Sequence, residues 1–160
     1  PRVMHGDPKI DNLLFDVHSD RALCLIDLDT VQPGLVHHDI GDSLRSCCNR
    51  LGESAGNAPA VTFDLNLCEA IVNAYAQEAG GLLDANEIAL LYPAIRLIPF
   101  ELGIRFLADH LQGDRYFAVT ERGQNLRKAR IQFALVADIE RKQAMIRRVV
   151  DCSFNHARRP

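Results

Sequence analysis

The fold is decided by the stretch His5–Asp42, which contains HGDPKIDNLLFD (5–16), LCLIDLDTVQPG (23–34) and the start of DIGDSLR (39–45). An apolar run, Leu13 to Phe15, follows the polar opening of the first motif. A second apolar run, Leu23 to Leu28, comes after a group of turn-forming residues, which are Asp16, His18, Ser19 and Asp20. Two short apolar runs separated in this way predict a β-hairpin. The hairpin would place Asp27 beside Asn12.

The polar residues of this stretch have the types and spacing that phosphoryl transfer requires. In that reaction a protein mainly positions groups and neutralises charge. Asp7 would accept or orient the proton of an attacking hydroxyl. Asn12 and Asp27 would hold Mg²⁺, which takes hard oxygen ligands and usually only one or two carboxylates from the protein. Lys9 would place its ammonium as a point charge against the transferred group.

Asp29 is a second candidate metal ligand. It follows Asp27 by two positions, and side chains alternate with a period of two along a strand, so both carboxylates would face one side. An isolated loop with such residues is often no more than a solvated turn. Two motifs in the correct order, each on the expected loop or strand end, favour a functional site instead.

The spacing H-x-D-x-K-x-x-N, followed by an aspartate on a nearby strand, resembles the catalytic loop of protein kinases. The wording HGD, with IDxD as the second motif, is similar to the aminoglycoside phosphotransferase and choline kinase family, and the similarity extends over nearly the whole chain. This resemblance implies a kinase-like fold, ATP and Mg²⁺ as cofactors, and a catalytic set of His5, Asp7 and Lys9. It also implies that Asp39 braces the catalytic loop, together with His5.

A later segment, LGIRFLADHLQGDRYF (102–117), most resembles the sugar kinases of that family that phosphorylate the anomeric hydroxyl of an N-acetylhexosamine. Those kinases supply sugar contacts from this segment, which implies Arg105 and Tyr116 as contacts to the acceptor. Thr30, beside the metal strand, is the third candidate. Asp7 would touch the reacting hydroxyl itself.

Length, composition and charge describe one ordinary domain. The chain has 160 residues, enough for one hydrophobic core and too few to suggest two domains. Its 18 Lys and Arg against 21 Asp and Glu give a net charge of −3, so no basic field would recruit nucleic acid. No apolar run reaches the length of a membrane span and no leader precedes the first motif, which predicts a cytoplasmic protein without membrane contact.

The position of the catalytic motif predicts a partial kinase. A kinase of this family needs an N-terminal lobe with a glycine-rich loop over the nucleotide. We therefore expect residues 1–160 to be the C-terminal lobe of a longer kinase, an α+β but mainly helical body with helices around a small β-hairpin that carries the catalytic and metal residues. The fragment alone is expected to be inactive. Apolar surface left bare by the missing lobe is expected to promote self-association.

Periodicity and turn residues predict the remaining elements. Pro33–Gly34 is expected to form a turn, and a helix to follow over residues 37–48. Residues 49–61 are rich in Gly, Ala, Asn and Pro, which predicts a mobile surface loop. Apolar side chains at helical spacing predict helices over 63–77 and, as one packing helix, over 125–150.

The segment between those helices carries its own start and stop residues. Asp84 with Glu87 three positions later has the form of a capping box at a helix start. Pro93 and Pro99 would kink or divide that helix, because proline lacks the backbone N–H that the helix needs. Asp109 is expected at its solvated end.

Other acceptors and another class of protein remain open. Choline requires an aromatic cage, and the chain has no tryptophan and few aromatic residues. Aminoglycosides are polycations that favour an acidic pocket, and no acidic cluster stands out in the C-terminal helices, so a neutral sugar fits best. Alternatively, the chain is a non-catalytic binding module with a kinase fold. The presence of Asp7, Asn12 and Asp27 argues against that loss of chemistry.

Overall fold

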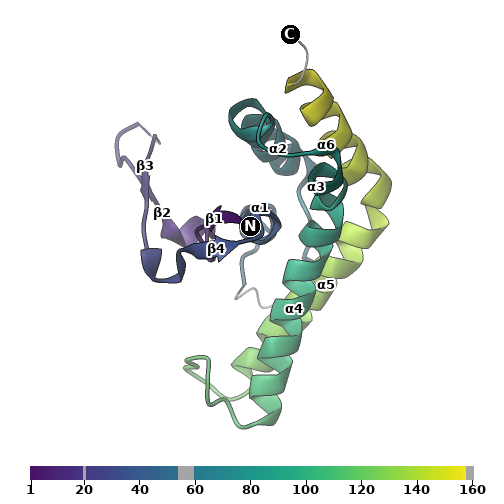
Figure 1. Cartoon of the computed structure of the whole chain (residues 1–160). Helices are drawn as coiled ribbons and strands as arrows, with labels where there is room; N and C mark the ends of the chain where they lie inside the picture. The colour runs from purple at the N-terminus through teal and green to yellow at the C-terminus, as the bar shows by residue number, and fades with distance from the viewer. Residues whose placement is uncertain (20, 54–59, 158–160) are drawn as a thin grey trace.

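The computed structural model describes residues 1–19, 21–53 and 60–157. It confirms the predicted mainly helical α+β class, with two small sheets in the N-terminal part of the chain (Figure 1). The strands are β1 (Arg2–Met4), β2 (Leu13–Phe15), β3 (Ala22–Leu25) and β4 (Gln32–Gly34). The helices are α1 (Val36–Cys47), α2 (Leu65–Ala79), α3 (Ala85–Ala89), α4 (Leu91–Leu111), α5 (Gln124–Arg141) and α6 (Gln143–Ala157). Two 3₁₀ turns, η1 (Ile10–Asn12) and η2 (Leu28–Thr30), flank the hairpin.

The predicted hairpin is confirmed as the antiparallel pair β2–β3, in which Leu13 lies opposite Leu25. A second antiparallel pair, β1–β4, was not predicted, and it contradicts the expected turn at Pro33–Gly34. Gln32 to Gly34 instead extend along Met4 to Arg2. Because β1 and β4 flank the hairpin in sequence, their pairing holds both ends of residues 5–31 together.

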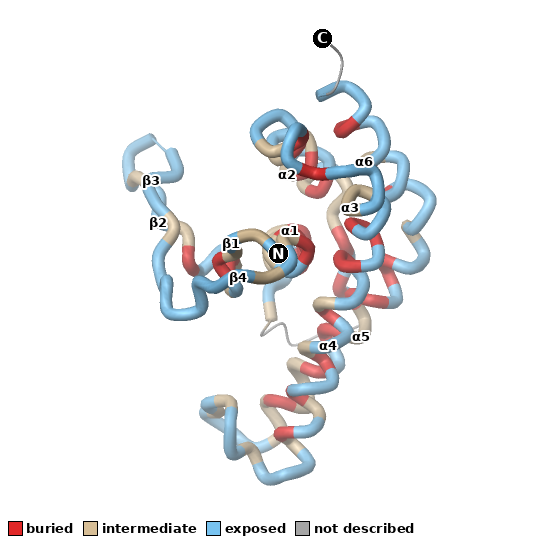
Figure 2. The backbone as a smooth tube through the Cα atoms, in the orientation of Figure 1, coloured by how far each residue is buried: buried red, intermediate tan, exposed pale blue. Residues whose placement is uncertain are grey.

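The hydrophobic core lies among the helices, whereas the hairpin is largely exposed (Figure 2). The largest fully buried apolar side chains include Leu44, Phe63, Ile95, Leu135 and Ile146. Each contributes roughly 1.5–3 kcal/mol through removal of its surface from water. Helix α1 lies close against α4 at Gly41, where a Cβ atom would lie 2.6 Å from Cγ1 of Ile98 and 3.0 Å from the carbonyl oxygen of Ala94. This close packing fixes α1, which carries Asp39.

The helix boundaries follow capping residues more closely than periodicity. Helix α2 begins at Leu65 because the Asp64 side chain caps it, accepting hydrogen bonds from the N–H of Asn66 and Leu67. The capping box of Asp84 and Glu87 is confirmed at the start of α3.

The prolines do not divide α4 where they were expected to. The break between α3 and α4 falls at Leu90. Pro93 lies in the first turn of α4, where an N–H has no partner within the helix. Helix α4 continues through Pro99 to Leu111.

The prediction of one helix over residues 125–150 is wrong, because the chain breaks at Lys142 into α5 and α6. The Lys142 ammonium donates hydrogen bonds to the Phe63 carbonyl (2.7 Å) and to Asp138 Oδ2 (2.6 Å). Asp138 Oδ2 also accepts a hydrogen bond from the Phe63 N–H at 2.6 Å. Two polar contacts to the distant Phe63 and one local contact between Lys142 and Asp138 therefore coincide with the break.

The predicted mobile loop lies partly outside the described residues, since 54–59 are not among them. The five cysteines are free; Cys48 and Cys68 are buried, whereas Cys24 and Cys152 are exposed. Among the described helices, none has both the length and the apolar character needed to cross a membrane.

Candidate active site

The HGD loop, residues 5–12, is held by one carboxylate from α1. Asp39, in the first turn of that helix, accepts hydrogen bonds from the N–H of His5 (2.7 Å) and of Gly6 (2.8 Å). A helix N-terminus favours a negative charge, so the carboxylate is well placed there. Gly6 has a φ of 89°, and a Cβ atom at this position would lie 2.8 Å from the Thr30 carbonyl oxygen. Only glycine fits this bend without strain.

His5 and Thr30 add a second set of braces. The Thr30 hydroxyl donates to the His5 carbonyl at 2.8 Å. The buried His5 ring lies 3.0 Å from the Ile26 carbonyl through Nε2 and accepts from the Asp7 N–H at 3.3 Å through Nδ1. Both residues therefore connect the HGD loop to the segment after the hairpin. The Thr30 hydroxyl hydrogen is engaged by backbone, and its role as an acceptor contact stays a prediction.

Asp7, Lys9 and Asn12 form one hydrogen-bonded cluster on this loop. The Lys9 ammonium pairs with Asp7 Oδ2, and the Asn12 amide nitrogen donates to the carbonyl (2.7 Å) and to Oδ2 (3.1 Å) of Asp7. Burial lowers the pKa of Lys9, but the hydrogen bond to Asp7 and the charges of Asp7, Asp27 and Asp42 raise that pKa above its ordinary value. Lys9 is therefore a permanent cation close to three carboxylates.

Asn12 and Asp27 offer oxygen atoms to a cation. Among the described residues, both side-chain hydrogen bonds of Asn12 use its amide nitrogen, which leaves the side-chain oxygen for a ligand. Asp27 follows β3 with a left-handed φ of 63°, and the Ile26 N–H next to it donates to the Asn12 carbonyl at 2.9 Å. One amide and one carboxylate oxygen fit Mg²⁺, with water and phosphate oxygens as its other ligands. The described residues contain no group of three or more His, Cys, Asp and Glu suited to a metal.

The strand geometry expected for Asp29 is wrong. Strand β3 ends at Leu25, Asp27 is left-handed, and Leu28–Thr30 form a 3₁₀ turn. Side chains in a 3₁₀ turn repeat every three residues, so the two-residue alternation of a strand does not apply here. The assignment of Asp29 as a metal ligand loses that support and stays a prediction.

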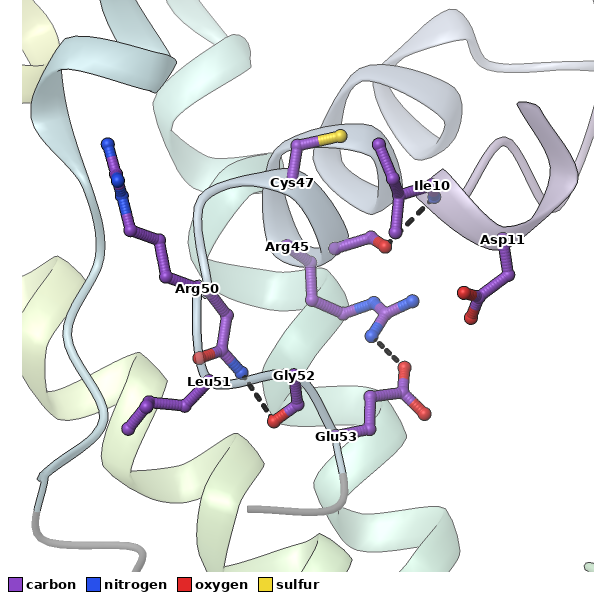
Figure 3. Close-up of a pocket in the computed structure, with 10 residues that line it drawn as sticks. Ile10, Asp11, Arg45, Cys47, Arg50, Leu51, Gly52 and Glu53 are labelled. Atoms are coloured by element: carbon purple, nitrogen blue, oxygen red, sulfur yellow. Dashed lines mark hydrogen bonds and ion pairs between the residues drawn. The ribbon is translucent and has the colours of Figure 1, made fainter. Parts of the chain in front are cut away.

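A cavity of about 450 Å³ opens beside the HGD loop (Figure 3). Its lining comes from η1, the end of α1 and the loop after it: Ile10, Asp11, Arg45, Ser46, Cys47, Asn49, Arg50, Leu51, Gly52 and Glu53. The Ile10 N–H donates to the Ser46 hydroxyl at 3.0 Å, which ties η1 to α1 along this cavity. Small-molecule sites commonly have volumes of roughly 300–1,000 Å³.

Arg45 is a functional candidate that the sequence patterns did not identify. Its side chain is only 3% exposed, donates from Nε to Asp42 Oδ1 at 2.7 Å, and pairs through Nη1 with Glu53 (Figure 3). Burial raises the pKa of Asp42, while the charge of Arg45 opposes that shift. Within the described parts of the chain, Asp42 Oδ2 and Asn49 Oδ1 are buried without a hydrogen-bond partner. Such atoms indicate a place for a bound water or ligand.

The structure brings Arg105 and Tyr116 together at the other end of α4. Arg105 Nη2 lies 3.5 Å from the Tyr116 hydroxyl, and the guanidinium carbon lies 5.7 Å from the Tyr116 ring centroid. In the described residues, no hydrogen bond or ion pair joins this pair to the HGD loop. The expectation that Asp109 is solvated is wrong: it is buried, and its carboxylate binds backbone N–H groups of the following loop.

These elements resemble the catalytic part of a kinase-type phosphotransferase. The sequence profile of the phosphotransferase enzyme family, APH, matches residues 1–80, which is half of the 160 residues. The chain belongs to this family. The match covers the HGD loop, the hairpin and α1, and it confirms the kinase-like family that the motifs predicted. Membership implies an enzyme that transfers phosphoryl groups between nucleotide and small-molecule substrates.

Proposed function

We propose that this chain carries the catalytic loop of an N-acetylhexosamine 1-kinase, which transfers the γ-phosphoryl group of ATP to the anomeric hydroxyl of the sugar in the presence of Mg²⁺. The observation that carries the proposal is the cluster of Asp7, Lys9 and Asn12 on a loop braced by Asp39. A base, a cation and a metal-ligating amide then lie within one hydrogen-bonded group. Phosphoryl transfer depends mainly on such positioning.

Among the described residues, the contacts to the Asp7 carboxylate use Oδ2, which leaves Oδ1 for the acceptor hydroxyl. Lys9 and Asn12 both contact Oδ2, so Oδ1 is the atom that accepts the hydroxyl proton. Lys9 keeps its positive charge, since its pKa is raised, and attracts the transferred group. Asn12 and Asp27 would hold Mg²⁺, which when bound neutralises charge on the phosphate oxygens.

A neutral, hydroxyl-rich acceptor fits the polar groups near this loop. The cavity beside η1 is lined by both signs of charge, since Arg45 and Arg50 as well as Asp11 and Glu53 belong to its lining, and Arg45 pairs with Glu53 directly. A polycation would find as many cations as anions there, whereas hydroxyl groups can both donate and accept. Arg105, Tyr116 and Thr30 are the proposed further contacts to the sugar.

The exposed hairpin supports a longer active parent. Leu14, Phe15, Val17 and Leu23 are all exposed on this one hairpin, Val17 at 87%, and extensive exposed apolar surface normally marks an interaction site. We propose that a nucleotide-binding lobe of the parent kinase covers the hairpin, that the fragment alone is inactive, and that the bare surface promotes self-association. Light scattering checks this: a clean monomer of the 160-residue chain at high concentration argues against the proposal.

An acceptor screen on the full-length parent tests the function. ATP and Mg²⁺ are supplied with N-acetylglucosamine, N-acetylgalactosamine, choline or an aminoglycoside, and ADP formation is measured against an acceptor-free control. Turnover with an N-acetylhexosamine supports the proposal. Turnover with choline or an aminoglycoside alone removes the sugar assignment and keeps the role of Asp7. If none of the four acceptors is turned over although ATP still binds, the result favours the non-catalytic binding module.

A further inference from the structure

The last turn of α4 contains a buried carboxylate with an unusual number of partners. Asp109 is 5% exposed. Its Oδ1 accepts hydrogen bonds from the N–H of Arg115 (2.9 Å) and Tyr116 (2.8 Å), and its Oδ2 accepts from the N–H of Phe117 (2.9 Å). The Asn125 amide donates to Oδ2 at 2.9 Å. One side chain thus binds three consecutive N–H groups of the 112–117 loop.

The loop adopts a conformation that needs these bonds. Gly113 and Asp114 both have left-handed φ values, 88° and 56°, and the left-handed region is sparsely populated by residues other than glycine. Asn125, which is fully buried, also donates to Asp114 Oδ1 at 2.9 Å. Burial alone raises the pKa of Asp109, but the three backbone N–H groups outweigh it and lower that pKa below its ordinary value. The carboxylate therefore stays ionised and continues to accept these hydrogen bonds.

The residue that this arrangement holds in place is itself exposed. Tyr116 is 75% exposed, yet its backbone N–H is bound to Asp109 and its ring packs edge-on against Phe117 at 4.8 Å between centroids. The guanidinium carbon of Arg105 lies 5.4 Å from the Phe117 ring centroid. Arg105 lies on α4 and Tyr116 on the loop, so their pairing depends on where the loop sits.

The side chains on the loop suit a ligand contact. In Figure 1 the segment after α4 and the hairpin β2–β3 both lie to the left of the α4–α5 pair, the segment at the lower end of α4 and the hairpin above it. An aromatic face beside a guanidinium offers a stacking surface and several hydrogen-bond donors to a hydroxylated ring. A buried charge is costly unless fully paired, and here its partners order an exposed tyrosine.

We propose that Asp109 is a positioning residue for the acceptor, which sets Tyr116 against Arg105 so that the pair binds a neutral polyhydroxylated ligand. This inference rests on the proposed function, because Arg105 and Tyr116 are acceptor contacts only there. Asp109 acts through the loop and does not touch the acceptor.

The first test is Asp109→Asn in the full-length parent, with the acceptor identified by the screen. Asparagine keeps the size but replaces one accepting oxygen with an N–H₂ group that faces other donors. The KM for the acceptor is expected to rise roughly tenfold, whereas kcat and the KM for ATP stay within about twofold. Asp151→Asn, at an exposed position on α6, is the matched control and should leave all three constants unchanged.

A spectroscopic readout separates positioning from general stability. Three tyrosines of the parent, Tyr75, Tyr92 and Tyr116, lie in these 160 residues. Fluorotyrosine labelling gives each a ¹⁹F resonance, and single Tyr→Phe variants assign the three. Acceptor addition should shift the Tyr116 resonance in the wild type. In Asp109→Asn this resonance should move before any acceptor is added, while those of Tyr75 and Tyr92 stay in place.

A double-variant comparison decides whether Asp109 acts through Tyr116. Tyr116→Ala alone should raise the acceptor KM, and adding Asp109→Asn should raise it little further. Two results overturn the proposal: an equal further rise in the Tyr116→Ala background, or an unchanged acceptor KM in Asp109→Asn although its Tyr116 resonance has moved.

The outcomes distinguish this inference from the proposed function. If the parent phosphorylates only a non-sugar acceptor, the sugar assignment fails, and an unchanged KM for that acceptor in Asp109→Asn overturns the inference as well. If no acceptor is phosphorylated, each acceptor is titrated into the labelled wild-type protein. A Tyr116 resonance that none of them shifts overturns the inference. Should Asp109→Asn fail to fold, Asn125→Ala replaces it, with an expected rise in acceptor KM of about threefold; no rise contradicts the inference.

Discussion

Two loops of this chain are each held by one aspartate of a neighbouring helix, but at opposite helix ends. Asp39, in the first turn of α1, binds two N–H groups of the HGD loop. Asp109, in the last turn of α4, binds three N–H groups of the 112–117 loop and the Asn125 amide. A carboxylate is favoured at a helix N-terminus and disfavoured at a C-terminus. The second loop therefore supplies more donors to its carboxylate.

The comparison separates two proposed tasks within one chain. The HGD loop carries the groups proposed to act on the reacting atoms, namely Asp7, Lys9 and Asn12. The 112–117 loop carries Tyr116, which faces solvent beside Arg105. Disturbing the first loop should lower kcat, whereas disturbing the second should raise the acceptor KM. The first three predictions below test that division in the proposed full-length parent, and the fourth tests a stabilising ion pair elsewhere in the chain.

The largest effect is expected at the base. Asp7→Asn removes the proton acceptor, so kcat should fall by about 10³-fold with the acceptor KM little changed. Steady-state kinetics measure both constants, with Asp151→Asn as the control. If the Asp7→Asn variant keeps the kcat of the wild type, Asp7 is not the base. The role assigned to the HGD loop is then contradicted as well.

A smaller loss is expected when the brace is weakened. Asp39→Asn retains one accepting oxygen for two N–H groups, so His5 or Gly6 loses its partner and the loop shifts. Displacement of a reactive group by about 1 Å can cost roughly 10²-fold in rate. We expect kcat to fall by about that factor and the acceptor KM to stay within about twofold. The opposite pattern, a raised acceptor KM with normal kcat, would contradict the division of tasks between the two loops.

Combining the two braces tests their independence. The double variant Asp39→Asn, Asp109→Asn should show the kcat loss of the first and the KM rise of the second, each within about twofold of the single variants, because sites without shared partners usually act additively. Strong non-additivity in kcat/KM would mean that the two loops form one coupled unit.

The smallest effect concerns the pairing that anchors β1. Arg2 pairs with Glu87 at the start of α3, and its hydrogen bond lowers the pKa of Glu87 to about 2. A depressed folded-state pKa gives stability that is present above the unfolded value and lost as pH falls through the folded one. The wild type should therefore lose stability between about pH 5 and pH 2 more steeply than Glu87→Gln. Urea unfolding at several pH values measures the free energy of unfolding of both proteins. If the two plots of this free energy against pH run parallel, the Arg2–Glu87 pair does not contribute to stability.

Local features of the sequence predicted much of the candidate site, and the family resemblance implied its Asp39 brace, but neither predicted the β1–β4 pairing that holds both ends of residues 5–31. The spacing of Asp7, Lys9 and Asn12 and the hairpin that brings Asp27 near them are short-range, so motif and turn residues suffice. The β1–β4 pairing has no comparable pattern, because three-residue strands leave almost no alternation to detect. The strand continuation expected for Asp29 failed because Asp27 adopts a left-handed conformation.

Long-range polar contacts explain the other differences. The break at Lys142 involves Asp138, whose partner Phe63 lies 75 positions away. Arg45 resembles an ordinary helix cation in the sequence, and only the fold buries it between Asp42 and Glu53. Asp109 follows apolar residues at a helix end and precedes a polar turn, a context typical of a solvated side chain. Its burial becomes evident only when the loop folds back over it.

The most direct test of the account is a ³¹P NMR spectrum of the product that the full-length parent forms from N-acetylglucosamine, ATP and Mg²⁺. The proposed function predicts a sugar 1-phosphate, recognised by coupling of its phosphorus to the anomeric proton. Phosphate on another hydroxyl, or only ADP and inorganic phosphate, would contradict it.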